Sequence, residues 1–94
     1  MKLFVVVRRD LTPSQSAVQG GHALAEYMLN SSRWKNSTLV YLGIKNLRSL
    51  ERLKYRLDQE GTKYYEFREP DIGNQPTAIS CDVESKLFEK LNLL

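Results

Sequence analysis

A short apolar run near the start of the sequence leads directly into a helix signal, and this combination narrows the possible folds more than any other part of the chain. Leu3–Val7 is continuous, apolar and rich in valine, a pattern typical of a strand that is covered on both faces. Thr12 then provides a helix cap, Pro13 suits the first helical position, and Gln15 can complete a capping box. A buried strand followed at once by a helix predicts an α/β fold.

The rest of the chain continues this alternation. Asn46 can cap a second helix, Gly61 follows its end, and Asp82 can cap a third. The sequence therefore predicts one α/β domain over residues 1–94, in which a mixed four-stranded sheet is flanked by helices in the order β-α-β-α-β-β-α. The expected strands are Leu3–Val7, Thr38–Ile44, Thr62–Arg68 and Pro76–Cys81, and the expected helices are 13–30, 47–60 and Val83–Leu91.

Apolar spacing predicts which face of each helix is buried. The first helix also contains the pair Gly20-Gly21, which costs about 1–2 kcal/mol relative to alanine and so suggests a close approach of a neighbouring element or a ligand. Pro76 places the fourth strand at a sheet edge or marks the residue where that strand begins. The expected buried residues are Ala17, Gly21, Leu24 and Met28 in the first helix, Leu47, Leu50, Leu53 and Leu57 in the second, and Leu87, Phe88 and Leu91 in the last.

Composition excludes several classes of protein. Hydrophobic residues make up 41% and charged residues 27% of the chain, as in ordinary globular domains. The longest apolar runs are far too short to cross a bilayer and no secretory signal is evident, so we expect a cytoplasmic protein with no membrane partner. Cys81 is the only cysteine and His22 the only histidine, which excludes an internal disulfide and predicts no metal site. We expect no cofactor.

Positive charge is concentrated in the first part of the chain, up to residue 56, and the remainder is net acidic. A row of arginines repeats every four residues along the second helix, and two further cations flank Trp34 in the connection before it. Such rows contact phosphates, and exposed aromatic rings stack on bases. The alternative is a solvated helix face partly paired with Glu51 and Asp58. The candidate RNA-binding residues are Arg33, Lys35, Arg48, Arg52 and Arg56.

The first helix presents a row of polar side chains. Gln15, Gln19, His22 and Glu26 are spaced so that they line one helix face. Free N–H groups of the first helical turn add a partial positive charge that suits a phosphate or a developing oxyanion. A solvated face with a capped end is the alternative.

The loop between the third and fourth strands, Glu69–Pro76, is the other candidate segment. Asp71 is the best carboxylate in the chain for orienting a water, although Pro-Asp-x-Gly is also an ordinary turn in which the aspartate bonds its own backbone. Arg8 ends the first strand, where open α/β sheets place their sites. A structural pair between Arg8 and Asp10 is equally compatible with the sequence.

Two blocks of sequence point to a known family. The first is Val6–Leu11 (VVRRDL) followed by Ala17–Ala23 (AVQGGHA), and the second is Asp71–Gly73 (DIG) followed by Thr77–Ile79 (TAI). Together they resemble the type II peptidyl-tRNA hydrolase family, which is found widely in archaea and eukaryotes. The resemblance covers nearly the whole chain. It implies a mixed-sheet α/β fold, hydrolysis of the ester that links a peptide to tRNA, and no metal or organic cofactor.

The sequence departs from the family pattern at two functional positions. The lysine that the family uses in catalysis falls at Gln15, and the threonine that normally follows the loop glycine is replaced by Gln75, with Thr77 as a substitute if the alignment slips. The turn before the first helix and the D-x-G loop are both shorter than in the family. Removing one member of a polar catalytic constellation commonly costs a factor of about 10²–10⁴ in rate. The positions that carry over are Gln19, Asp71 and Gly73.

The leading hypothesis is therefore a compact peptidyl-tRNA hydrolase-like enzyme. In it Asp71 holds or deprotonates the attacking water, Gln19 assists, and His22 is a further catalytic candidate. The alternative is a catalytically weak or inactive module of the same fold that binds tRNA or a protein. The expected partner is tRNA or peptidyl-tRNA, and a homodimer is left open. The candidate substrate-binding residues are Arg8, Gln15, Gly73, Asn74, Gln75 and Thr77.

Overall fold

The first apolar run forms the central strand of a five-stranded mixed sheet in the computed structural model, which describes residues 1–94. β1 (Lys2–Arg8) lies between β2 (Thr38–Ile44), with which it is parallel, and β4 (Gln75–Cys81), with which it is antiparallel. β3 (Tyr65–Glu69) pairs with β4 at one edge and β5 (Asn92–Leu93) pairs with β2 at the other, both antiparallel. The α/β class and the mixed sheet are confirmed, but the sheet has five strands, not four.

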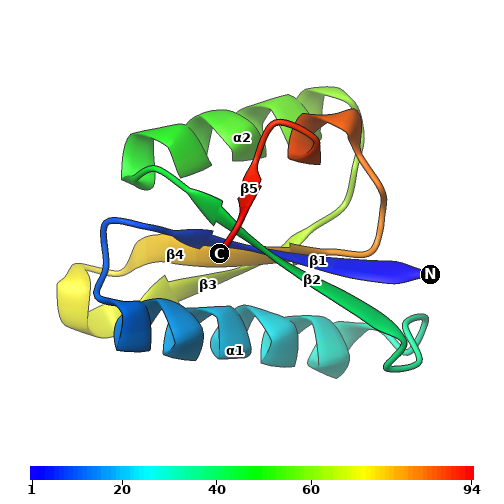
Figure 1. Ribbon diagram of the computed structural model, residues 1–94, viewed down its shortest axis with the longest axis horizontal. Helices are drawn as coiled ribbons and strands as arrows, with labels where there is room; N and C mark the ends of the chain where they lie inside the picture. Colours follow the sequence, from blue (N-terminus) through cyan, green and yellow to red (C-terminus); the bar gives the residue numbers. More distant parts are fainter.

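Two helices cover opposite faces of this sheet (Figure 1). α1 (Pro13–Asn30) lies on one face and α2 (Leu47–Gln59) on the other, and both begin at the end of the sheet where β1 and β2 finish. Successive side chains of β1 alternate between the two layers, so the strand contributes to a core on each side. The larger core, on the α2 side, contains Phe4, Val6, Leu42, Ile44, Leu50, Leu53, Leu57, Ile79, Cys81 and Phe88.

The predicted capping box of α1 is confirmed, but its predicted buried face is wrong. Tyr27 is fully buried, and its hydroxyl donates to Asp82 at 2.9 Å and accepts from the Trp34 N–H at 2.9 Å. This anchored ring turns the helix by one residue, or about 100°, from the predicted orientation. The predicted residues Ala17, Gly21 and Met28 are exposed as a result. The buried residues of α1 are Ser16, Gln19, Gly20, Ala23 and Tyr27.

The two helical glycines have different surroundings. A Cβ atom on Gly20 would lie 2.6 Å from the Tyr41 ring of β2, so the absence of a side chain allows α1 to pack on the sheet. A Cβ atom on Gly21 would meet nothing within 4 Å. The close approach suggested by the sequence is therefore made by Gly20 to a strand, and packing does not require the second glycine.

The predicted helix Val83–Leu91 does not form. Asp82, its expected cap, instead accepts the Tyr27 hydroxyl, and Ser85 caps a single 3-10 turn, η2 (Lys86–Phe88). Phe88 is buried and stacks on Phe4 with ring centroids 5.0 Å apart. The chain then runs along β2 as β5, which pairs with an edge that would otherwise be open. Pairing of this sheet edge outweighs the weak helical periodicity of the segment.

The other predicted elements are confirmed with small shifts. Asn46 caps α2, and Leu50, Leu53 and Leu57 are buried as expected. β3 begins at Tyr65, three residues later than predicted, and Pro76 is the second residue of β4, opposite a register shift in β3. β4 is an inner strand, so Pro76 belongs to the beginning of a strand and not to an edge. Neither helix has the length and apolar composition needed to span a membrane.

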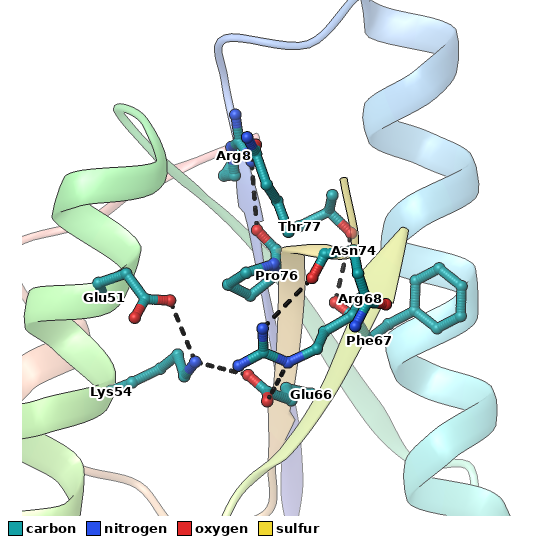
Figure 2. A network of polar contacts seen from close by, with 10 residues as sticks. Arg8, Glu51, Lys54, Glu66, Phe67, Arg68, Asn74, Pro76 and Thr77 are labelled. Atoms are coloured by element: carbon teal, nitrogen blue, oxygen red, sulfur yellow. Dashed lines mark hydrogen bonds and ion pairs between the residues drawn. The ribbon is translucent and has the colours of Figure 1, made fainter. Parts of the chain in front are cut away.

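A buried lysine joins α2 to the sheet (Figure 2). The side chain of Lys54 is 11% exposed, and its ammonium lies 2.6 Å from Glu66 Oε2 of β3 and 3.1 Å from Glu51 Oε1. Arg68 donates to the other oxygen of Glu66 at 2.9 Å. Burial by itself raises the pKa of Glu66, but the hydrogen bonds and charges of Lys54 and Arg68 outweigh it and hold this pKa below the ordinary 4.5.

This network predicts a loss of stability in acid. Because the folded-state pKa of Glu66 is depressed, its contribution is fully present above about pH 4.5 and is lost as the pH falls through the lower folded-state value. Glu66→Gln should lower the free energy of unfolding by about 1–3 kcal/mol at pH 7, with the difference shrinking below pH 4. Urea unfolding at pH 7 and at pH 3 measures the free energy of unfolding, and Glu89→Gln, at an exposed position, is the control. An equal deficit at pH 7 and pH 3 would contradict the assignment.

Candidate functional site

A cleft of about 320 Å³ opens beside the start of α1. Its walls come from the loop after β1, the first two turns of α1, the end of β3 with the 3-10 turn η1 (Pro70–Ile72), and β4. Four predicted site residues from separate parts of the chain meet here, namely Gln15, Gln19, Asp71 and Thr77. The full lining is Leu11, Ser14, Gln15, Val18, Gln19, Glu69, Asp71, Ile72 and Thr77.

A buried hydrogen bond lies at the back of this cleft. Thr77 Oγ1 donates to Gln19 Oε1 at 2.6 Å, and both residues are buried. The Gln19 carbonyl is therefore occupied, whereas its amide nitrogen makes no hydrogen bond within the protein. Thr77 thus fixes the amide plane and leaves the Nε2 donor available to a ligand.

The start of α1 contributes less hydrogen-bonding capacity than its sequence suggests. Pro13 has no N–H, and the N–H groups of Gln15 and Ser16 already donate to Thr12. The Gln15 side chain accepts from the Thr12 N–H at 3.1 Å, which completes the capping box. Ser14 is the one first-turn residue whose N–H has no acceptor in the protein. The predicted group of helix-start donors is therefore reduced to one N–H.

The charge of the cleft is negative. Glu69 and Asp71 are its two ionisable residues, and no lysine, arginine or histidine lines it. Leu11, Val18 and Ile72 supply an apolar wall, and Val18 is 56% exposed although it is a large aliphatic residue. Glu69 lies in the candidate segment Glu69–Pro76 predicted from the sequence, but it was not named as a site residue, although its place two residues before Asp71 was a usable signal. Such a cleft suits an uncharged or apolar group beside a carboxylate base and disfavours a phosphate.

Arg8 is not available to a ligand. It is 6% exposed, and its guanidinium donates to both Asp10 oxygens, at 2.9 and 2.7 Å. It also donates to Gln75 Oε1 at 2.9 Å. A further hydrogen bond, to the Pro76 carbonyl at 3.3 Å, is drawn in Figure 2. The hydrogen bonds from Arg8 to Asp10 hold the pKa of Asp10 below its usual range, against the opposing effect of partial burial. Arg8 and Gln75, both expected to bind substrate, instead connect the end of β1 to the start of β4.

Three other predicted site residues lie outside the cleft lining. His22 is exposed on α1, and its ring stacks on Phe67 with centroids 4.2 Å apart and planes at 9°. Gly73 and Asn74 adopt left-handed conformations, with φ of 72° and 59°, and turn the chain from η1 into β4. Their position beside the cleft fixes the loop that carries Asp71.

The basic candidates form two separate groups. Arg48, Arg52 and Arg56 are exposed on α2, form no ion pair, and lie on the opposite side of the sheet from α1. The connection that carries Arg33 and Lys35 lies at the other end of α1 from the cleft (Figure 1). Arg33 lies 3.7 Å from Asp82, whereas Lys35 has no carboxylate partner.

The expected aromatic stacking surface beside Arg33 is wrong. Trp34 is 4% exposed and its indole N–H donates to the Thr38 carbonyl at 3.0 Å. It packs with Leu3 and Tyr27 as part of the core. No three His, Cys, Asp or Glu side chains come close enough together to hold a metal ion.

The position of Arg8 predicts a structural effect on substitution. Arg8→Met should lower the free energy of unfolding by about 2–3 kcal/mol, because the acceptors on Asp10, Gln75 and Pro76 lose a charged donor. Urea unfolding measures this, and the exposed Lys35→Met is the matched control with the same change of charge. Unchanged stability of the Arg8 variant would mean that the guanidinium is free to serve a ligand.

Comparisons with known proteins establish the fold and go no further. No family model matches the chain, and no curated protein is similar to it at a significant level. Among solved structures, the chain is similar to a protein of unknown function from Agrobacterium tumefaciens strain C58, with a TM-score of 0.72 and 11% sequence identity. The match covers 99% of this chain and 96% of that protein. The chain thus shares the fold of that protein, an α/β arrangement that here has a five-stranded mixed sheet between two helices.

Proposed function

We propose that the protein hydrolyses the ester bond between a peptide and tRNA. The observation that carries the proposal is the meeting of Asp71 with the Gln19–Thr77 hydrogen bond in one cleft. These three residues belong to the blocks that resemble type II peptidyl-tRNA hydrolases, and they are far apart in the sequence. A carboxylate base next to an oriented amide donor is a minimal arrangement for attack of water on a carbonyl.

In the proposed reaction Asp71 accepts a proton from the attacking water as its oxygen bonds to the ester carbonyl carbon. The charge that develops on the carbonyl oxygen is stabilised by hydrogen bonds from Gln19 Nε2 and from the Ser14 N–H. The bond between that carbon and the ribose oxygen then breaks, and the proton passes from Asp71 to the leaving oxygen. The products are a tRNA with a free ribose hydroxyl and a peptide carboxylic acid, which releases its remaining proton to the solvent and becomes a carboxylate. The apolar wall of the cleft would contact the peptide end.

The structure bears differently on the two departures from the family pattern. Thr77 lines the cleft and contacts Gln19, which supports it as the substitute for the threonine replaced by Gln75. Gln15 also lines the cleft, but its side chain caps the helix and brings no charge. The proposed site therefore lacks a cation, and we expect a slow enzyme.

The first test is hydrolysis of an N-blocked aminoacyl-tRNA by the purified protein. Asp71→Asn should lower kcat/KM by about 10²–10³, because it removes the base and keeps the side-chain shape. Glu69→Gln, in the same cleft, is the matched control and should stay within about tenfold of the parent. His22→Asn should leave the rate unchanged. Absence of turnover above the uncatalysed rate would contradict the proposed hydrolase activity. A larger loss of rate in the Glu69 variant than in the Asp71 variant would assign the role of general base to Glu69.

The second test restores the family's cation. Gln15→Lys would release the side chain from the Thr12 N–H and place an ammonium in the cleft that holds Asp71 and Glu69. We expect the hydrolysis rate to rise by about tenfold or more, since a cation near the developing oxyanion stabilises the transition state. Gln15→Met, which also removes the cap acceptor but adds no charge, is the control. An equal change in both variants would show that the effect comes from the cap.

A non-catalytic RNA-binding module of the same fold is the second candidate. The absence of any cation from the cleft favours it, because the family's catalytic lysine has no replacement there. Such a module would bind tRNA with an affinity that falls steeply with salt, would hydrolyse nothing, and would not respond to Gln15→Lys.

A further inference from the structure

A second hollow, of about 430 Å³, lies at the carboxyl ends of β1 and β2 and is distinct from the acidic cleft. Three of its eight lining residues are cations, and none is an acid. None of these three cations forms an ion pair with any carboxylate of the protein, although six ion pairs exist elsewhere in it. The lining is Arg9, Gly43, Ile44, Lys45, Ser49, Lys90, Leu91 and Asn92. We refer to this site as the basic hollow.

The guanidinium of Arg9, in the lining of the basic hollow, is held in place by contacts with the sheet. Its backbone N–H donates to the Ile44 carbonyl at 2.7 Å, and its Nη2 donates to the Leu93 carbonyl at 2.6 Å. The side chain passes over Gly43, where any Cβ atom would overlap with the guanidinium. The glycine therefore creates the space in which Arg9 lies. An arginine fixed at both ends loses little conformational entropy when it binds an anion.

The topology of the sheet also favours a site here. β1 and β2 are parallel neighbours, and their following helices leave on opposite faces of the sheet (Figure 1). Open α/β sheets bind ligands in the crevice outside the carboxyl ends of such strands. α2 begins at this point with no acidic residue in its first turn. Ser49, in that turn, has a hydroxyl that makes no hydrogen bond within the protein and can donate to a ligand.

We propose that the basic hollow is a phosphate-binding site in which Arg9, Lys45 and Lys90 supply the charge and Ser49 a hydroxyl donor. The identity of the phosphate rests on the proposed function: it is a phosphodiester of the tRNA strand whose end reaches the acidic cleft. Arg9 and Leu11 both line a third, smaller hollow. Arg9 also lines the basic hollow and Leu11 also lines the acidic cleft, so these two sites are connected along one end of the sheet. The carboxylates of the cleft repel phosphate, which therefore needs a separate place to bind.

Titration with inorganic phosphate, followed by NMR of the backbone amides, tests the site itself. Sodium chloride at equal ionic strength is the reference. We expect saturable shifts over Gly43–Ser49 and at Asn92, and at least about tenfold weaker binding in the double variant Lys45→Gln/Lys90→Gln. Lys2→Gln/Lys63→Gln makes the same change of net charge at exposed positions outside the basic hollow and should leave the affinity unchanged. Absence of saturation, or an equal loss in both double variants, would overturn the proposal.

A short single-stranded RNA ending in CCA tests the source of the phosphate. If the source is RNA, the same amides shift together with those of Ser14–Gln19, and Lys45→Gln/Lys90→Gln weakens binding by about tenfold or more. Phosphate binding without RNA binding would overturn the RNA assignment and identify a small phosphorylated compound as the ligand. RNA binding at the basic hollow without any hydrolysis would support this site and contradict the proposed enzyme. Both substituted lysines are exposed, so the variants keep the fold.

Discussion

The structure depends on the burial of β1 between two neighbouring strands and two helices. Its backbone pairs with β2 on one side and β4 on the other, and its side chains alternate between the two cores. Leu3, Val5, Val6 and Val7 are all fully buried, so the strand has no freedom to slide or rotate. Both helices begin at the end of the sheet where this strand finishes, and that is where the cleft and the basic hollow lie.

The charges at this end of the sheet are segregated. One set lines the cleft beside α1, with two carboxylates and no cation, and the other lines the basic hollow, with three cations and no carboxylate. The neighbours Arg8 and Arg9 illustrate how the fold divides them. Arg8 is buried and neutralised by Asp10, whereas Arg9 projects beyond the strand without a carboxylate partner. A substrate with an apolar acyl end and an anionic body would match this division.

Local signals in the sequence were sufficient wherever the structure is set by neighbouring residues. The capping box at Thr12, the cap at Asn46 and the leucine stripe of α2 all lie within one or two turns, and all were predicted correctly. Predictions failed where distant contacts decided the outcome. The anchored hydroxyl of Tyr27 rotated α1, and pairing with β2 replaced the expected last helix by β5. Trp34 was expected at the surface and is a core residue, because the N-terminal strand covers it.

The α/β class, most element boundaries and four polar residues of the cleft lining could be predicted from the amino-acid sequence alone. The sequence identified Gln15, Gln19, Asp71 and Thr77, because residue type and spacing limit the chemistry that a segment can perform. Which candidates meet in the cleft, and which are used internally as Arg8 and Gln75 are, depended on contacts between distant segments of the folded chain. The tertiary structure also revealed the basic hollow, whose cations come from three distant segments. Such convergence depends on how strands are ordered in a sheet, and no local pattern of residues records that order.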